Sequence, residues 1–186
     1  MNKQKGFTLI ELLVVIAIVA VLAVVVILTL NPAELIRQAR DSNRISDMAT
    51  LKSAIALYLA DNSTSTWPAS STCFISFTTT SNCTFGFAAA GVVKPSTSTV
   101  VDGTGWLPIN FSVISSGAPI GSLPIDPLNN GAYLYGFMAT STNNAFKLVA
   151  SGMESTKYGA GGTSDVVGTD GGTKPKAYEV GTNLNM

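Results

Sequence analysis

Apolar residues near the start of the chain form one long segment. Residues 7–30 are apolar apart from three positions, Thr8, Glu11 and Thr29. As a helix this segment would be about 36 Å long at 1.5 Å per residue, whereas the hydrocarbon core of a bilayer is about 30 Å thick. The pattern therefore predicts a hydrophobic, membrane-spanning helix over residues 7–31.

Two ordinary explanations of this segment are incomplete. A cleaved secretory signal needs a short apolar core that ends in small residues, but this core is long and ends in Leu28-Thr29-Leu30-Asn31-Pro32. A plain membrane anchor explains the length but leaves Glu11 without a role. An acidic side chain costs about 2.5–3.5 kcal/mol at the centre of a membrane helix and less near its end. Glu11 is therefore a candidate functional residue.

Asn31 and Pro32 divide this segment from a second, amphipathic helix predicted over residues 32–61. Proline disfavours helix at the preceding residue but suits the first helical position, so we expect a kink or short break near Thr29–Pro32. Seven apolar residues fall near one stripe at helical spacing and are expected to pack on the C-terminal domain: Leu35, Ile45, Met48, Leu51, Ile55, Tyr58 and Leu59. Charged residues spaced three or four apart predict ion pairs on a solvated face: Arg37, Asp41, Arg44 and Asp47.

The C-terminal domain, residues 62–186, is predicted to be rich in loops with a small sheet. Residues 132–140 and 145–151 predict the two strands of an antiparallel hairpin, because Tyr133, Tyr135 and Phe137 recur at every second position of the first and Phe146, Leu148 and Ala150 at every second position of the second. Weaker strands are expected at Phe85–Phe87 and Val92-Val93, and a final edge strand at Ala177–Val180. Trp106–Phe111 supply a large apolar surface that should pack on the helix. Residues 159–176 are rich in glycine and predict an extended loop.

Composition argues against several functions. The net charge is zero, so no basic surface indicates nucleic-acid binding. The chain has no histidine, the commonest general base, and no Ser/Lys pair or paired carboxylates indicate an enzyme. Cys73 and Cys83 lie close together in a Ser/Thr-rich stretch and suit a disulfide if the domain is exported; two buried free thiols are the alternative.

The run Lys5-Gly6-Phe7-Thr8-Leu9-Ile10-Glu11 and the apolar residues after it resemble the N-terminus of type IV prepilins and pseudopilins. The resemblance implies that a membrane peptidase removes residues 1–6 as a leader by cutting after Gly6. It also implies that the new N-terminal residue, Phe7, is methylated and that Glu11 is retained. The fold implied is α+β: a long N-terminal helix, half membrane-spanning and half amphipathic, packed against a small antiparallel sheet with long loops.

Cleavage would place a positive α-amine at Phe7, one helical turn from Glu11. A carboxylate and an amine about 4 Å apart attract by about 4 kcal/mol at an effective dielectric constant of 20. In a filament the amine of a neighbouring copy can pair with Glu11 instead and set the register of the incoming subunit. The alternative is that Glu11 only reaches towards lipid headgroups.

These observations predict a structural protein, a major-pilin-like subunit that polymerises into a type IV pilus. A pseudopilin of a type II secretion or DNA-uptake system would share every N-terminal feature. A membrane-anchored binding or adhesion domain that never polymerises, or a surface enzyme, would belong to other classes. The expected partners are further copies of the chain, the prepilin peptidase and methylase, and an assembly platform in the membrane. We expect a single-pass membrane protein whose C-terminal domain lies outside the cytoplasm, and afterwards a surface filament.

The chain has one weak candidate for a cofactor. Some related pseudopilins bind calcium in a C-terminal loop, and Asp165 and Asp170 lie in the glycine-rich residues 159–176. The ligand spacing of a calcium-binding loop is missing there. A plain surface loop without a metal ion is therefore the favoured prediction.

Overall fold

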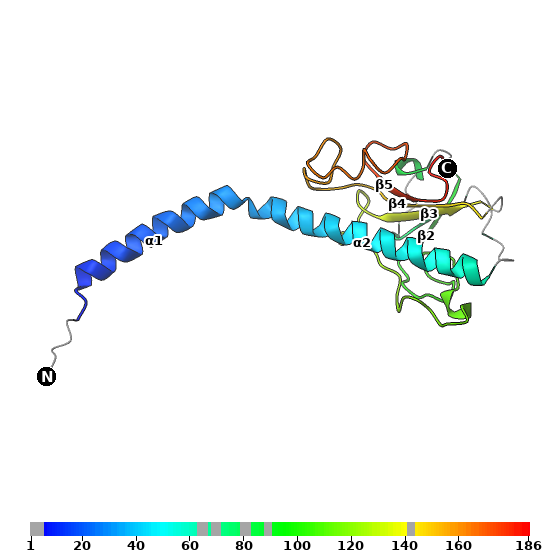
Figure 1. The fold of residues 1–186 in the computed structure, drawn as a ribbon, viewed down its shortest axis with the longest axis horizontal. Coiled ribbons are helices and arrows are strands. Elements are labelled where there is room, and N and C mark those ends of the chain that lie inside the picture. Colours follow the sequence, from blue (N-terminus) through cyan, green and yellow to red (C-terminus); the bar gives the residue numbers. More distant parts are fainter. Residues whose placement is uncertain (1–5, 63–66, 68–71, 79–82, 88–90, 141–143) are drawn as a thin grey trace. The chain divides into compact units, whose positions relative to one another are not determined.

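The computed structural model describes residues 6–62, 67, 72–78, 83–87, 91–140 and 144–186. The chain forms two compact units, Met1–Ile36 and Arg37–Met186, of which we call the second the head unit. The elements of both units are labelled along the ribbon in Figure 1.

Two helices follow one another with a single residue between them. Helix α1 spans Leu9–Leu30 and helix α2 spans Pro32–Asp61. Asn31 between them has a left-handed backbone conformation (φ 42°, ψ 71°), which asparagine tolerates better than most residues. Pro32 begins α2, where its missing N–H would have had no helical partner. The predicted break and the predicted end of the second helix at Asp61 are both confirmed.

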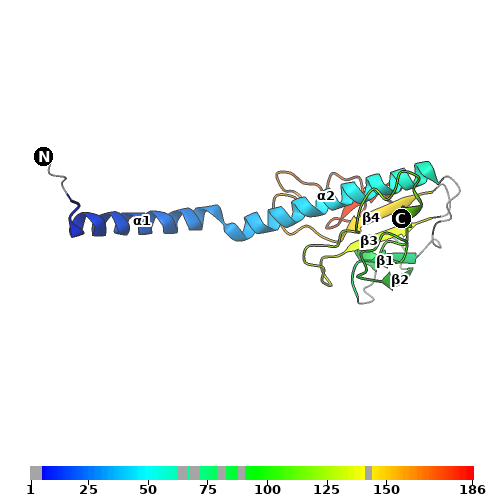
Figure 2. The same ribbon diagram turned by 90° about the horizontal axis from the view of Figure 1, so that it is seen from below.

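The head unit contains a five-stranded sheet against which α2 lies (Figures 1 and 2). The strands are β1 (Thr72–Ile75), β2 (Val92–Pro95), β3 (Tyr135–Ala139), β4 (Phe146–Ala150) and β5 (Tyr178–Gly181), in the spatial order β2-β1-β3-β4-β5. Strands β1 and β2 are parallel, and the other neighbours are antiparallel. The predicted α+β fold is confirmed, with a sheet that is mostly rather than wholly antiparallel.

The main core lies between α2 and the sheet. Phe74, Phe137 and Leu148 form a row across β1, β3 and β4, and all three side chains are buried. From the helix, buried Met48, Leu51 and Ile55 belong to the same core, which Trp106 also joins as predicted. The stripe is correct from Met48 onwards. Ile45 is only partly buried, and the prediction is wrong for Leu35, because about half of this residue is exposed.

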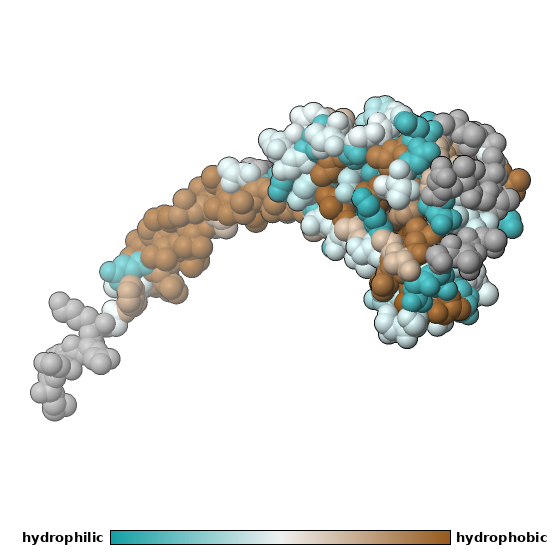
Figure 3. Space-filling model, turned by 45° about the vertical axis from the view of Figure 1, so that its right-hand side comes forward, coloured by the Kyte–Doolittle hydropathy of each residue, from teal (hydrophilic) through white to brown (hydrophobic). Residues whose placement is uncertain are grey.

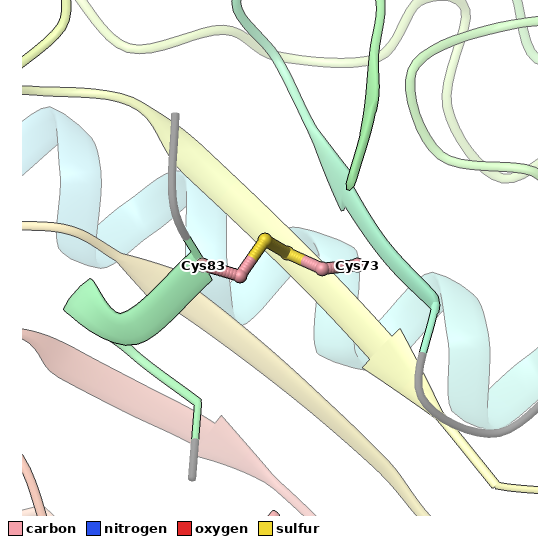
Figure 4. The surroundings of a disulfide bond; sticks show 2 residues. All are labelled: Cys73 and Cys83. Atoms are coloured by element: carbon pink, nitrogen blue, oxygen red, sulfur yellow. A yellow bond between two sulfur atoms is a disulfide. The ribbon is translucent and has the colours of Figure 1, made fainter. Parts of the chain in front are cut away.

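The opposite face of the sheet carries a second core. Cys73, Ile75 and Met138 point to this face, because side chains alternate along a strand. A disulfide joins Cys73 in β1 to Cys83, with an S–S distance of 2.07 Å. Figure 4 shows the bond on the near side of the strands and α2 behind them. The two cysteines predicted to pair therefore do so in the structure.

The smaller elements show where local patterns mislead. Val92-Val93 begin β2, and the predicted hairpin strands pair as β3 and β4, although residues 141–143 of its loop lie outside the described residues. The predicted strand at Phe85–Phe87 is wrong, because Cys83–Phe85 form a turn of 3-10 helix. Strand β1 was not predicted. The edge strand β5 and the loop character of residues 159–176 are confirmed.

Candidate functional site

Helix α1 presents an apolar surface with no covering from its own unit. Leu9–Ile27 are long and apolar enough to cross a membrane, and none of this span is buried. Hydrophobic residues cover the helix in Figure 3, whereas the head unit has a mixed surface. Moving large apolar side chains out of water into an apolar environment is favourable. A lipid bilayer or other apolar helices around an apolar helix of this length would therefore stabilise it.

Glu11 lies in the first turn of α1, where it takes part in a capping box. The Thr8 N–H and the Thr8 hydroxyl donate to Glu11 Oε2 at 2.8 and 2.7 Å, and the Glu11 N–H donates to Thr8 Oγ1 at 3.3 Å. The helix therefore begins at a Thr-x-x-Glu sequence, a known start signal. The carboxylate is fixed at the N-terminal end of the helix, where the helix dipole also favours negative charge.

Gly6 and Phe7 lie just before this helix. Both residues are exposed and outside any helix or strand, and 87% of the Phe7 side chain is accessible. A Cβ atom added to Gly6 would meet nothing within 4 Å, so there is open space on that side of the residue. The structure thus places Gly6, Phe7 and Glu11 at one helix end, with Gly6 and Phe7 both exposed.

The apolar helix and the sequence at its start together indicate a membrane-anchored, single-pass protein. Residues 1–27 match the prokaryotic N-terminal methylation motif, the signature of type IV pilin and pseudopilin precursors. The motif supports a type IV pilin-like or pseudopilin precursor, and the family that it marks is structural rather than catalytic. No curated protein and no solved structure matches the chain.

A buried cluster of charges fixes α2 within the head unit. Arg44 is fully buried and donates to both carboxylate oxygens of Asp126, from Nε at 2.6 Å and from Nη2 at 2.9 Å. Its Nη1 lies 2.6 Å from Asp41 Oδ1 and 2.7 Å from Glu154 Oε1. Burial acts to lower the pKa of Arg44, but the bonds to Asp126, Glu154 and Asp41 raise it beyond its ordinary value. Arg44 therefore stays charged.

The cluster holds two loops against the helix. Asp41 accepts backbone N–H bonds from Glu154 and from Ser155, the latter at 2.7 Å. Arg40 donates from two nitrogens to Glu154, and this bond, more than any other, lowers the pKa of Glu154. We call Arg40, Asp41, Arg44, Asp126 and Glu154 the ion cluster. The predicted solvated face is therefore wrong for Asp41 and Arg44, because carboxylates and backbone groups from distant loops enclose them.

Asp47, the last of the predicted charged residues, also faces inwards. It accepts a hydrogen bond of 2.7 Å from the Tyr135 hydroxyl. Burial raises the pKa of Asp47, and burial together with the Asp47 carboxylate raises the pKa of Tyr135. The Tyr135 hydroxyl therefore remains a neutral donor, which links α2 to the middle of the sheet.

The weak calcium candidates cap separate turns. Asp165 accepts backbone N–H bonds from Gly161 and Gly168, and Asp170 accepts them from Gly172 and Glu179. Among the residues that the structure describes, no three His, Cys, Asp or Glu side chains lie close enough together to hold a metal ion. The two aspartates thus serve as turn-forming acceptors in the structure.

The sequence contains a signal for only some of these residues. The partnership of Thr8 with Glu11 follows the Thr-x-x-Glu start signal and was open to prediction. The partners of Arg44 were not, because Asp126 and Glu154 lie 82 and 110 positions away along the chain. No local pattern carries that information.

Proposed function

We propose that this chain is the precursor of a structural, major-pilin-like subunit. Cleavage between Gly6 and Phe7 removes the six-residue leader, Phe7 is N-methylated, and α1 then polymerises into a type IV pilus filament. The observation that carries the proposal is the fully exposed apolar helix that bears a single carboxylate at its start, joined to a head unit with its own core. Such a helix serves as a membrane anchor before assembly and as a filament core afterwards.

The physical chemistry of lipid supports a guiding role for Glu11. Leaving lipid for a bundle of similar helices changes the hydrophobic free energy little, so packing and polar contacts must direct association. In the precursor, Glu11 Oε2 is satisfied by Thr8. After cleavage the α-amine of a neighbouring copy supplies a stronger, charged partner. Each copy then offers one amine and one carboxylate, which makes the contact heterologous and lets the assembly grow without closing.

The outer face of α2 also suits a helical assembly. A groove of about 440 Å³ runs along it, between small side chains such as Ala49 and Ser53 and a wall formed by Pro119 and Ile120. Small residues allow another backbone to approach closely. None of the residues that line this groove is charged, so a neighbouring apolar segment could lie there without burying an unpaired ion.

The partners follow from this proposal. A prepilin peptidase and methylase acts on Gly6 and Phe7, an assembly platform in the membrane receives the subunit, and further copies of the chain complete the filament. The head unit lies outside the cytoplasm before assembly and on the cell surface afterwards. This head unit needs no cofactor for the structural role, and calcium binding to residues 159–176 stays a minor alternative.

Mass spectrometry of purified surface filaments tests the proposal. The expected main component begins with a methylated Phe7 and lacks residues 1–6. Subunits that keep residues 1–6 within a working filament would overturn it. A pseudopilin of a secretion or DNA-uptake system carries the same motif and would give the processed N-terminus without abundant long filaments. A processed chain found only as single copies in the membrane would indicate an anchored binding or adhesion domain.

A further inference from the structure

Lys147 is a fully buried cation in the sheet of the head unit. It lies in β4, opposite Met138 of β3 and Gly181 of β5, and Met138 in turn pairs with Cys73. The side chain therefore points to the face of the sheet that carries the disulfide, away from α2. Burying an ammonium group costs several kcal/mol unless oxygen atoms replace its water.

Three oxygen atoms replace that water. Lys147 Nζ lies 2.5 Å from Glu179 Oε1 and donates to the main-chain oxygens of Leu184 at 2.7 Å and Met186 at 3.2 Å. Two of the three N–H donors of the ammonium group thus bond to main-chain oxygens, and Glu179 Oε1 neutralises the charge as an ion-pair partner. The ring of Phe87, 5.7 Å from Nζ, covers the group from another side.

Glu179 extends these contacts into the glycine-rich loop. Its second oxygen, Oε2, accepts the backbone N–H groups of Thr173 at 2.6 Å and Lys174 at 3.3 Å. The loop passes so close to this carboxylate that a Cβ atom on Gly172 would collide with it. One ammonium group thus joins β4 to the last residues of the chain and, through Glu179, to residues 172–174.

We propose that the Lys147 ammonium group is a built-in cation that fastens residues 182–186 and the loop 172–174 to the sheet. A carboxylate oxygen and two main-chain oxygens around a positive charge are the kind of ligands that a hard metal ion would take. The lysine supplies this charge from within the chain, so the fastening is independent of calcium. The substitution Lys147→Ala shortens the side chain and leaves a site that accepts a small alkylammonium ion. This role of Lys147 is separate from the proposed filament function.

The wild-type protein gives the first test. In the full chain, held in detergent micelles, NMR of the lysine Nζ groups should show a slowly exchanging ammonium signal for Lys147. Lys52 is exposed on α2 and should give no such signal. A Lys147 ammonium group that exchanges with water as fast as that of Lys52 would overturn the proposal.

Variants give the second test. In Lys147→Ala, hydrogen exchange at the amides of Thr182 and Asn183, which bond to Phe146 O, should become about tenfold faster or more. Propylammonium chloride replaces the missing Cγ to Nζ atoms and should restore slow exchange, whereas sodium or tetramethylammonium chloride at equal ionic strength should not. Lys52→Ala makes the same charge change on an exposed surface and should leave these amides unaffected.

Three further results would contradict the proposal. Lys147→Met keeps the length of the side chain without its charge. If the amides of Thr182 and Asn183 exchanged as slowly in this variant as in the wild type, packing alone would hold residues 182–186. Faster amide exchange in Lys147→Ala that propylammonium fails to slow would also mean that packing, not the charge, holds residues 182–186. Slower exchange of the wild-type amides on adding calcium chloride would mean that a metal ion fastens the segment.

Discussion

Arg44 of α2 and Asp126, 82 positions later in the chain, form a two-pronged ion pair in which both side chains are almost completely buried. The ring of Tyr133 lies against the guanidinium group, 4.7 Å from its carbon atom. Because Arg44 also contacts Asp41 and Glu154, one side chain joins the helix to two loops. The stability of the head unit should therefore depend strongly on this residue.

Replacing Arg44 by methionine should destabilise the head unit by about 3–5 kcal/mol, because it leaves buried carboxylates without their cation. Denaturant unfolding followed by the fluorescence of the buried tryptophans, Trp67 and Trp106, measures the change. Asp126→Asn should lower the free energy of unfolding by less, since Arg44 keeps its ion pairs with Asp41 and Glu154. Lys52→Met, on the exposed side of α2, serves as the control and should change stability little. Equal effects of Arg44→Met and Lys52→Met would contradict the prediction.

Glu154 should make the stability of the head unit depend on pH. Hydrogen bonding from Arg40, supported by Arg44, holds the pKa of Glu154 below its ordinary value of 4.5. The stabilisation is therefore complete above pH 4.5 and is lost as the pH falls through the lower pKa of the folded state. Denaturation midpoints measured from neutral pH to about pH 3 should converge for wild type and Glu154→Gln. If the difference between the two midpoints stayed the same at every pH, the ionisation of Glu154 would not contribute to the pH dependence of stability.

Glu11 and Thr8 can be tested as a matched pair. Glu11→Gln keeps a side chain that can cap the helix but removes the charge, and it should reduce the mass of surface filaments about tenfold or more, as expected for a lost ion pair of a few kcal/mol. Thr8→Ala removes the hydroxyl of the capping box but keeps the carboxylate, and it should reduce the mass much less. Similar losses would mean that Glu11 acts only by capping its own helix. Both variants should still reach the membrane, as immunoblots of membrane fractions can establish.

Removing the disulfide should cost about 2–3 kcal/mol, the loss expected for a loop of this size. Cys73 and Cys83 are separated by 10 positions, and both are fully buried. The double variant Cys73→Ala, Cys83→Ala and the reduced wild-type protein should unfold at similarly lowered denaturant concentrations. An oxidised wild type no more stable than the double variant would contradict this estimate.

The helical part of the fold could be predicted because its signals are local. The apolar residues of α1, the punctuation at Asn31-Pro32 and the stripe that contains Met48 each lie within a few turns of one another. The same local reasoning failed at Asp41 and Arg44. Charged residues three positions apart on a helix usually indicate a solvent-exposed face. Only contacts with distant loops bury Asp41 and Arg44.

The sheet shows a second limit of local patterns. Phe146 and Leu148, the alternating residues that predicted this strand, lie on the face that meets α2. By the same pattern Lys147 belongs on the opposite face, which would be solvated if the sheet had a single core. The disulfide-bonded segment and the last residues of the chain cover that face, and neither covering is visible in the sequence of β4.

The left-handed residue Asn31 has a practical consequence for handling the protein. The helix is interrupted at Asn31, between the apolar residues of α1 and the more polar residues of α2. Pro32 starts α2 without an amide hydrogen that would need a partner. A shortened chain that begins at Pro32 retains all of Arg37–Met186. Such a fragment should be recoverable from aqueous buffer without detergent, with a natural helix start in place of an artificial one.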